Sequence, residues 1–449
     1  MNDRPIGRRH FIYSAAGVAL AASARPLRAD STPLPQAAGH AESSVTTEAD
    51  VLVVGGGTAG TIAAIQAARA GAKTFLVERG TQLGGTMTTG GVSFPGLFDA
   101  WGKQIIAGIG WELVKESVEL DGGSLPDFSK VPNHHWMNQI HINQYLYPLL
   151  AEEKCQQAGV EIAYYEFPQS ITQTAEGWQV DCVGFGTKRR VLCKQIIDCT
   201  GGAEVAGLLG MPRLREKQIQ PGTLLYKLET TLNPGRPNNT RGPGLLIHQY
   251  LDDADSTNSR TVTAANLQGR KSVLAQVRKK NQRLTHVQPE MAFRESYRIL
   301  GETIITETDY TSGRIFDDAV AYAFYPVDVH KGTGFAKLQD LKPGIIPTIP
   351  LGALIPKGSC NILVAGRCIS SDRFANGGLR VQASCMAMGQ AAGVAAALAA
   401  AKNTTRSSLP AKRSSCPPPG AAQWQSAAAV GSEAPRINVG VTWGSVNKS

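Results

Sequence analysis

Val51-Leu52-Val53-Val54-Gly55-Gly56-Gly57-Thr58-Ala59-Gly60 is the segment that decides the fold. Its apolar residues, with Ala49 and Asp50 before them, predict a short buried strand, and the glycines that follow match the pattern G-x-G-x-x-G. Gly55 permits a tight turn, Gly57 leaves room for a pyrophosphate, and Gly60 lets the next helix lie close to the strand. The N-terminus of that helix also offers free N–H groups and a partial positive charge to phosphates.

A complete β-α-β unit surrounds this turn. Residues 61–71 are rich in Ala and Ile with helical spacing and end at Gly71, and residues 73–78 predict a second strand. Glu78, at the end of that strand, can accept hydrogen bonds from both ribose hydroxyls of an adenine dinucleotide, and it would repel a 2′-phosphate. Because this unit alone fits NAD as well as FAD, an NAD-dependent dehydrogenase remains one alternative.

The rest of the chain predicts further strands and helices around this unit. Helices are expected at 110–120, 142–159 and 378–401, strands of a small sheet at 159–171, 179–184 and 189–193, and buried strands at 194–200 and 360–365. The fold class is therefore α/β, with a Rossmann-like domain on a parallel sheet and an inserted α+β substrate domain.

The expected domains are discontinuous along the chain. We assign 47–100, 142–212 and 346–401 to the dinucleotide-binding domain, 101–141 and 213–345 to a substrate or cap region, 30–46 to a linker and 402–449 to a low-complexity tail. The helix at 378–401 carries small residues every four positions, which predicts close packing against another element. Its Arg and Gln residues and its abundance of Ala argue against a stable membrane span.

Composition excludes several classes of protein. Of 449 residues, 42% are hydrophobic and 18% charged, which indicates a folded chain. The net charge is +9, and no run of Lys and Arg predicts a nucleic-acid partner. The eight cysteines form no Cys-x-x-Cys pair, and the adjacent His134 and His135 cannot face one ligand on a helix or strand, so no metal site is expected.

The N-terminus resembles a twin-arginine export signal. Gly7-Arg8-Arg9-His10-Phe11-Ile12-Tyr13 precedes a short stretch of small apolar residues, 14–24, with cleavage expected after Ala24 or Ala29. The expected location is therefore periplasmic or secreted. Export in the folded state suits a protein that acquires its cofactor in the cytoplasm.

Three further segments carry a resemblance to a known family. They are 83–91 (LGGTMTTGG), 196–202 (IIDCTGG), and 361–367 (NILVAGR) followed by 377–381 (GGLRV). Together with the glycine turn they resemble the FAD-dependent oxidoreductase family related to the flavin subunit of heterodisulfide reductase, over residues 47–401. Relatives with iron–sulfur clusters use cysteine arrays that this chain lacks, so no cluster is expected.

The resemblance implies FAD as the cofactor. It places the first segment along the pyrophosphate, the second over the dinucleotide, and the helix after the third with its N-terminus near the N1–O2 side of the flavin, where its dipole favours the reduced anionic ring. The residues expected to bind FAD are Gly55, Gly57, Thr58, Ala59, Gly60, Glu78, Arg79, Gly84, Gly85, Thr86, Thr200, Gly201, Gly366, Arg367, Arg380 and Val381.

The expected activity is dehydrogenation or reduction of a small organic substrate by hydride transfer at flavin N5, with an electron donor or acceptor that the sequence leaves open. Alternation along a strand puts Asp328 and His330 on one face, where they could relay a proton; the alternative is a structural His–Asp pair. Arg294 could hold an anionic or polar group of the substrate; the alternative is a salt bridge with Glu295 or Glu302. The remaining alternative is that the protein is a non-catalytic flavin-binding or electron-transfer subunit.

Overall fold

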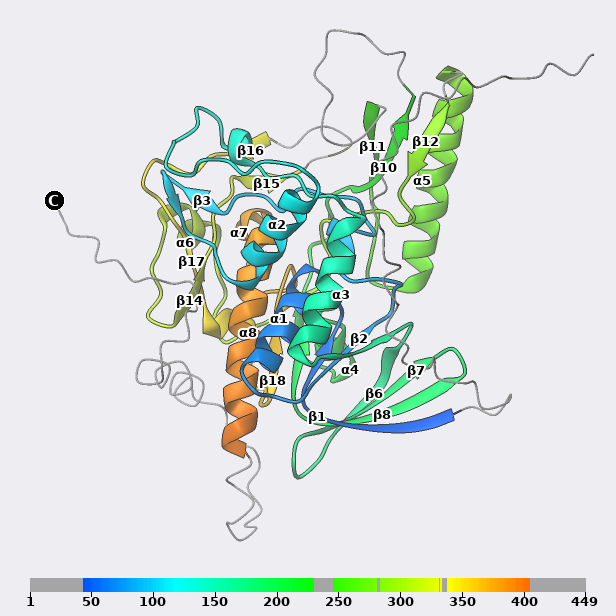
Figure 1. The fold of residues 1–449 in the computed structure, drawn as a ribbon, viewed down its shortest axis with the longest axis vertical. Helices are drawn as coiled ribbons and strands as arrows, with labels where there is room; N and C mark the ends of the chain where they lie inside the picture. Colours follow the sequence, from blue (N-terminus) through cyan, green and yellow to red (C-terminus); the bar gives the residue numbers. More distant parts are fainter. Residues whose placement is uncertain (1–42, 230–244, 281–282, 331, 333–336, 404–449) are drawn as a thin grey trace, which may run out of the picture. The chain divides into compact units, whose positions relative to one another are not determined.

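The computed structural model describes residues 43–229, 245–280, 283–330, 332 and 337–403 (Figure 1). These residues lie in one compact unit that begins at Glu42. The signal-like segment, most of the expected linker and nearly all of the expected tail lie outside the described residues.

A mixed, mostly parallel sheet forms the centre of the fold, in the order β5-β2-β1-β8-β7-β6, with β18 also paired to β8. Strands β5, β2, β1, β8 and β18 run parallel, whereas β7 is antiparallel to both β8 and β6. The strands are β1 (Ser43–Val54), β2 (Thr74–Glu78), β5 (Glu161–Tyr164), β6 (Phe167–Gln173), β7 (Trp178–Gly184), β8 (Thr187–Asp198) and β18 (Ile362–Val364). Together with the helices below, this sheet confirms the α/β fold class.

Strand β8 corrects one expectation. Residues 189–193 and 194–200 were expected as separate strands, but a single strand runs from Thr187 to Asp198. Its first half pairs with β7 and alternates between exposed and buried residues, whereas its last residues pair with β18 and are buried on both faces. The change in pattern therefore marks a change of neighbour and not a break in the strand.

Strand β1 is longer than the apolar run predicted. It begins at Ser43, inside the segment assigned to the linker, because residues 43–49 pair in parallel with Thr187–Cys193 of β8.

Helices α1 (Thr58–Arg69) and α8 (Gln382–Asn403) pack directly on each other and against strands β1 and β8 of the sheet (Figure 1). A Cβ atom on Gly389 would overlap the carbonyl of Ala59, and one on Gly393 would lie 2.5 Å from the carbonyl oxygen of Ala63. The glycines of α8 thus allow the two backbones to approach, as their spacing predicted. By length and composition α8 is the one helix of the described residues that could cross a membrane, yet 78% of its apolar window is buried inside the fold.

The expected start of this helix at residue 378 is wrong. Residues Arg373–Leu379 form a separate helix, α7, capped by the side chain of Asp372, and α8 begins at Gln382. The N–H of Ala383, in the first turn of α8, donates to the carbonyl of Pro95 at 2.8 Å, so a loop from the other half of the chain meets this helix start.

The other helices of this layer lie close to their expected positions. Helix α2 spans Ile109–Leu120, and α3 spans Leu146–Ala158 and ends at Gly159, whose φ is 82°. Short turns complete the region: η1 (Gly85–Met87), η2 (His135–Asn138) and α4 (Glu204–Leu208).

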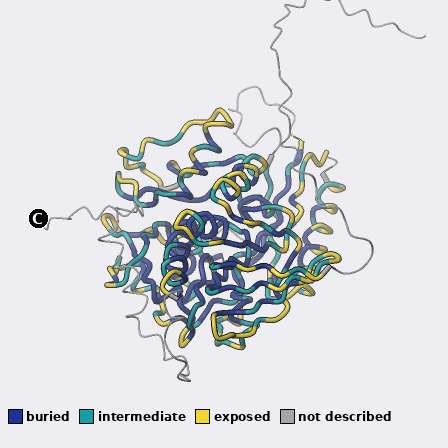
Figure 2. The backbone as a smooth tube through the Cα atoms, turned by 60° about the horizontal axis from the view of Figure 1, so that its bottom comes forward, coloured by how far each residue is buried: buried dark blue, intermediate teal, exposed yellow. Residues whose placement is uncertain are grey.

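A second, smaller sheet of antiparallel strands covers the site from the other side. It has the order β11-β10-β12, and helix α5 packs against it through a separate hydrophobic cluster. Its elements are β10 (Gly222–Leu228), β11 (Leu245–Leu251), α5 (Ser259–Lys280) and β12 (Leu284–Val287). Figure 2 shows the buried residues gathered in the interior of both layers.

Two-stranded ladders and short helices connect these parts. The pairs are β3 (Asp99–Ala100) with β4 (Lys103–Gln104), β9 (Arg213–Leu214) with β13 (Arg298–Ile299), β14 (Ala319–Tyr322) with β17 (Thr348–Pro350), and β15 (Val327–Val329) with β16 (Lys337–Gln339), together with α6 (Glu307–Ser312) and η3 (Leu351–Leu354).

Candidate functional site

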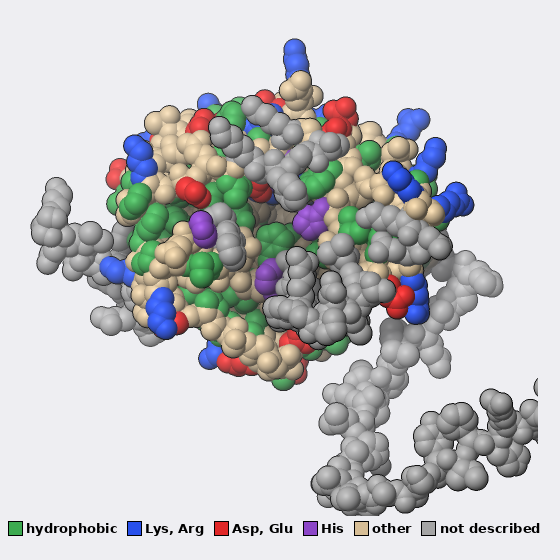
Figure 3. Space-filling model, turned by 90° about the horizontal axis from the view of Figure 1, so that it is seen from above, with side chains coloured by type: hydrophobic (Ala, Val, Ile, Leu, Met, Phe, Trp, Pro, Cys, Tyr) green, Lys and Arg blue, Asp and Glu red, His purple; other side chains and the backbone are tan. Residues whose placement is uncertain are grey.

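A cavity of about 530 Å³ opens where the parallel strands β1, β2 and β8 end. In open α/β sheets the carboxyl ends of the strands are where ligands bind, because loops and helix N-termini converge there. From the glycine turn, the lining continues to Arg294, Asp328 and Arg380. Figure 3 shows a hollow in the upper face of the molecule, with His side chains around it.

The glycine turn has the geometry that its sequence predicts. Gly55 has φ +98°, and a Cβ there would lie 2.7 Å from the carbonyl oxygen of Cys199. A Cβ on Gly60 would overlap the carbonyl of Gly55. At Gly57, by contrast, a Cβ would meet nothing within 4 Å, and this residue lines the cavity. The space beside Gly57 is therefore open to a ligand at the N-terminus of α1.

Glu78 lies beside this turn, at the end of β2. Its Oε2 accepts a hydrogen bond from the N–H of Gly56 and its Oε1 accepts one from the N–H of Gly80, both at 2.6 Å. Burial raises the pKa of the Glu78 carboxyl, although these hydrogen bonds act in the opposite direction. Each oxygen has a second lone pair, so the carboxylate can still accept hydrogen bonds from the hydroxyls of a ribose.

The loop after β2 lies across the turn. The N–H of Gly84 donates to the carbonyl of Gly56 at 2.9 Å, and the positive φ of both Gly84 (+99°) and Gly85 (+54°) bends the chain into η1. Gly85 and Thr86 line the cavity, whereas Gly84 is not among the lining residues. Arg79 also lines the cavity and forms an ion pair with Glu204 at 3.3 Å.

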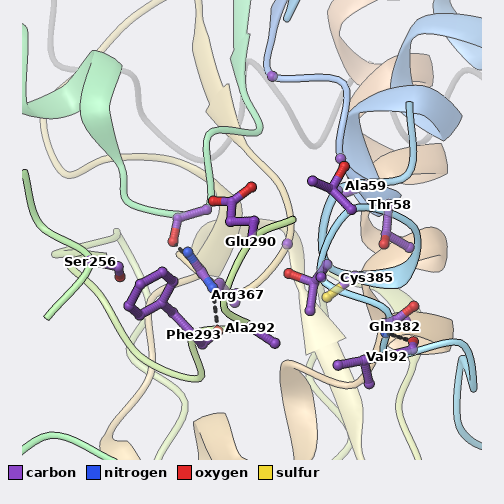
Figure 4. Close-up of a pocket in the computed structure, with 18 of the residues that line it drawn as sticks. Thr58, Ala59, Val92, Ser256, Glu290, Ala292, Phe293, Arg367, Gln382 and Cys385 are labelled. Carbon is purple, nitrogen blue, oxygen red and sulfur yellow. Dashed lines mark hydrogen bonds between the residues drawn. The ribbon is translucent and has the colours of Figure 1, made fainter. Parts of the chain in front are cut away.

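The wall formed by the end of β8 and the end of β18 is fixed by buried polar groups. Asp198 accepts hydrogen bonds from the N–H and hydroxyl of Thr200, and burial raises the pKa of its carboxyl. Arg367 donates from Nε to the carbonyl of Gly201 at 2.7 Å, and desolvation of its half-buried guanidinium lowers the pKa of this group. Figure 4 shows Arg367 in this wall beside Phe293. Thr200, Gly201, Gly366 and Arg367 all line the cavity, as expected.

The N-terminus of α8 forms another part of the lining. Arg380, Val381, Gln382 and Cys385 face the cavity from the link between α7 and α8 and from the first turn of α8. Gln382 is held by a hydrogen bond from its Nε2 to the carbonyl of Val92 at 2.8 Å (Figure 4). Burial raises the pKa of the Cys385 thiol to about 12, so this thiol stays protonated near neutral pH. The N–H of Ala383 is already hydrogen-bonded to Pro95, so what the start of α8 offers a ligand in this part of the cavity is the positive end of the helix and the lining residues Arg380 to Gln382.

Three charged side chains gather in the same cavity. Arg380 donates to Asp328 Oδ2 at 3.0 Å, and Arg294 donates from Nη1 to the carbonyl of Pro221 at 2.8 Å and to the hydroxyl of Thr223 at 2.6 Å. Burial and the nearby charge of Arg380 lower the pKa of Arg294 to about 10. Burial raises the pKa of Asp328, but the hydrogen bond from His330 and the charge of Arg380 more than offset this, and the result is about 2.

The structure brings together only part of the predicted catalytic set. Asp328 and Arg294 line the cavity; His330 is not among the lining residues. His330 Nε2 lies 3.3 Å from Asp328 Oδ1, so the expected pair does form. Its backbone N–H donates to Gln220 Oε1 at 2.9 Å.

The salt bridges considered as the alternative for Arg294 are not present among the described residues. Glu295 pairs instead with Arg373 at 2.8 Å, and Glu302 accepts a hydrogen bond from the N–H of Gly358.

Sequence reasoning missed part of the lining. Glu290, Ala292 and Phe293 come from the segment after β12, and His248 comes from β11, in a region where no motif stands out. The quoted segment 83–91 did contain Thr89, Gly90 and Gly91, which also line the cavity.

A comparison with known families decides the cofactor. The family described as FAD dependent oxidoreductase matches residues 50–256 and 229–414. This chain belongs to that family. It is therefore an FAD-dependent oxidoreductase, and the open space at Gly57, the carboxylate of Glu78 and the helix start at Gln382 fit an extended FAD molecule. No curated protein matches the chain significantly.

Several solved structures are distantly similar. OxyS, an anhydrotetracycline hydroxylase from Streptomyces rimosus, is 15% identical with a TM-score of 0.44; the match covers 81% of this chain and 64% of that one. A geranylgeranyl bacteriochlorophyll reductase-like protein from Thermoplasma acidophilum is 12% identical (TM-score 0.40, covering 86% and 83%). The p-nitrophenol 4-monooxygenase PnpA from Pseudomonas putida DLL-E4 is 12% identical (TM-score 0.40, covering 80% and 81%). Similarity at this level carries no information on substrate.

Proposed function

We propose that this FAD-dependent oxidoreductase is an exported enzyme that oxidises or reduces a small organic molecule. The observation that carries the proposal is the composition of one cavity, which joins a dinucleotide-binding turn to a buried cluster of Arg294, Arg380 and Asp328. When bound, FAD supplies hydride transfer at N5. The protein must then bind the cofactor, orient the substrate and manage protons.

The two helix starts would orient the cofactor. The N-terminus of α1 beside Gly57 would bind the pyrophosphate, and Glu78 would accept hydrogen bonds from the ribose. The N-terminus of α8, with Arg380 and Val381, would lie at the flavin, where positive charge stabilises the reduced ring. The loop at Gly85 and Thr86 would hold the pyrophosphate from the other side.

Arg294 binds an anionic or polar group of the substrate. The cluster holds two guanidinium groups against one carboxylate, so it has an excess positive charge in a largely desolvated place. The Nε of Arg380 is buried with no hydrogen-bond partner among the described residues. Because two buried guanidinium groups share the one carboxylate of Asp328, an anionic group on the substrate would supply the second counter-ion.

His330 holds the proton that the reaction exchanges. The low pKa of Asp328 keeps its carboxylate ionised near neutral pH, and its Oδ1 lies 3.3 Å from His330 Nε2, close enough to orient the imidazole ring. Asp328 lines the cavity, whereas His330 is not among the lining residues, so a proton from His330 would reach the substrate by way of this carboxylate. The kinetic test below distinguishes this role from a structural pair.

Purified protein should show the visible absorption bands of a bound flavin, and a screen of sugars, hydroxy acids and steroids should find compounds that bleach them. With such a compound, His330→Ala should retain its flavin but slow the reductive half-reaction, and Arg294→Gln should weaken substrate binding more strongly for anionic compounds than for neutral ones. Arg190→Gln, at an exposed position of β8 where Arg190 pairs with Asp181 and does not line the cavity, serves as the control. A His330→Ala protein with full flavin content and an unchanged bleaching rate would remove the proton role, and protein that shows no flavin band after FAD is added would remove the whole proposal.

The export part of the proposal depends on the N-terminal sequence alone. The paired Arg8 and Arg9, the following Phe11 and the short Ala-rich stretch support folded export to the periplasm or the outside of the cell. The order of the motifs also supports a relation to the flavin subunit of heterodisulfide reductase, without its iron–sulfur clusters.

A further inference from the structure

Helix α5 carries a positively charged face that the cavity does not use. Its 22 residues, Ser259–Lys280, contain no Asp or Glu. Five of its cations are exposed, and none of them forms an ion pair with a described residue. They are Arg260, Arg270, Lys271, Arg278 and Lys279. Arg270 donates a hydrogen bond to the carbonyl of Pro289, but this neutral group leaves its charge uncompensated, so the whole row of cations is available to an outside partner.

Two leucines are exposed in the same row. The side chains of Leu267 and Leu274 are 61% and 49% exposed. Residues 267, 270, 271, 274 and 278 recur at spacings of three and four, so they form one stripe along the helix. The exposed face of α5 is therefore amphipathic, with cations and apolar side chains intermixed and no negative charge.

The opposite face of α5 is fully used by the fold. Ala265 and Val273 are buried against β10 in the hydrophobic cluster of the smaller sheet, and Val262 reaches the wall of the cavity. Helix α5 thus packs on the smaller sheet at the rim of the molecule (Figure 1), and the residues of its outer face are exposed. Figure 3 shows Lys and Arg side chains gathered along the same edge of the molecule.

We propose that this face of α5 binds the surface of an anionic phospholipid bilayer, with the helix lying parallel to the membrane plane. A basic helix with exposed leucines is suited to this surface, because the cations meet the phosphates of the lipid headgroups and the leucines enter the boundary below them. At 1.5 Å per residue the helix is about 33 Å long, which gives a straight row of contacts that matches a plane. A nucleic acid would meet the cations but would leave the two leucines exposed to water.

Vesicle sedimentation tests this proposal. The chain without residues 1–29, which retains the whole compact unit, is mixed with vesicles of phosphatidylcholine alone or with added phosphatidylglycerol. We expect binding only to the anionic vesicles, and weaker binding as salt rises. The double variant Arg270→Glu, Lys271→Glu should lose at least about tenfold in partitioning, since two attractive charges near the surface become repulsive.

Matched variants distinguish binding through the exposed face of α5 from a general effect of the protein's net charge. Lys342→Glu with Lys357→Glu makes the same change in net charge at exposed positions outside α5 and should bind like the wild type. The double variant Leu267→Ser, Leu274→Ser should weaken the vesicle binding that remains at high salt, because this binding depends on apolar contacts. Unchanged circular dichroism and flavin content show that each variant folds.

Three outcomes would overturn the proposal. They are equal sedimentation of the α5 variant and the control variant, equal binding to vesicles without phosphatidylglycerol, and binding to heparin or DNA with none to vesicles. Because the readout is sedimentation, a failure of the flavin chemistry proposed above would leave this result unaffected.

Discussion

Gly57 and Gly60 lie one helical turn apart, yet the structure gives them different reasons to lack a side chain. Around Gly60 the protein itself fills the space, because a Cβ would overlap the carbonyl of Gly55. Around Gly57 the protein leaves the space empty, and its backbone, with φ −66°, is acceptable to any residue. Gly60 is therefore required by the fold, whereas Gly57 is required by what enters the cavity.

This difference makes a paired prediction. Gly57→Ala should leave the thermal stability of the FAD-free protein unchanged but weaken FAD binding at least about tenfold, because one methyl group displaces the pyrophosphate from the N-terminus of α1. Gly60→Ala should destabilise the FAD-free protein by roughly 1–3 kcal/mol, the usual range for overpacking. Calorimetry of both FAD-free variants and a fluorescence titration with FAD distinguish the two effects. An FAD-free Gly57→Ala protein that melts like Gly60→Ala would contradict the assignment.

A second prediction at this scale concerns acid stability. The pKa of Asp328 falls from 3.8 to about 2 in the folded protein, so folding favours its ionised form. Its contribution is therefore complete above pH 4 and is lost as pH falls toward 2, and by linkage it amounts to roughly 2 kcal/mol.

The measurement compares urea unfolding of the wild type and Asp328→Asn at pH 5 and at pH 3. The asparagine variant should be less stable at pH 5, where it leaves Arg380 without its carboxylate, and the gap should narrow at pH 3. A gap that stays constant or widens in acid would show that Asp328 is not held ionised by its neighbours.

At the scale of elements, the contact between α1 and α8 links the stability of the fold to the shape of the site. Gly389 of α8 presses against the backbone of Ala59, and Ala59 lines the cavity. Gly389→Leu should therefore destabilise the protein by at least about 2 kcal/mol and also lower FAD affinity, because α8 has to move away from α1. Ala401→Leu, at the exposed end of the same helix, is the control. Unfolding experiments measure the stability of both variants, and titrations with FAD measure their affinity. A Gly389→Leu protein that lost stability but bound FAD as tightly as the wild type would contradict the proposed link.

Much of the central sheet and of the helices that pack on it could be predicted, because local sequence patterns set these elements. The glycine turn, the strand before it and the helix ending at Gly159 depend on residues that are neighbours in the sequence. Strand β8 could not be divided correctly, since its two halves differ only in which strand lies beside them. The start of α8 was placed too early because Asp372 caps a separate short helix before it.

The rest of the site depends on tertiary contacts that leave no local signal. Alternation in β15 correctly paired Asp328 with His330, but it could not show that only Asp328 faces the cavity. Glu290 and Phe293 reach the lining because the smaller sheet folds over the glycine turn. Likewise, the basic face of α5 becomes visible only when its buried side is known.

At the scale of the whole molecule, the binding site is assembled from most of the described chain. The glycine turn near residue 57, the end of β8 near residue 200 and the start of α8 near residue 382 all line one cavity. Along the sequence, the last part of the cavity to be synthesised therefore lies more than three hundred residues after the first. FAD can bind fully only after the chain has been synthesised as far as α8. The export that we propose would therefore have to use a route that accepts folded protein if FAD is bound beforehand.

This requirement leads to a prediction about the paired arginines. In a bacterial host with a twin-arginine translocase, the full chain should reach the periplasm with its flavin bound, whereas Arg8→Lys with Arg9→Lys should leave a folded, flavin-containing protein in the cytoplasm. Fractionation followed by flavin fluorescence measures both location and cofactor content. Arg25→Lys with Arg28→Lys makes an equally conservative change near the expected cleavage sites and should not alter export. Continued export of the Arg8→Lys, Arg9→Lys variant would contradict this prediction. So would arrival of the wild type in the periplasm without flavin, because a chain that crosses the membrane unfolded can bind FAD only outside the cytoplasm.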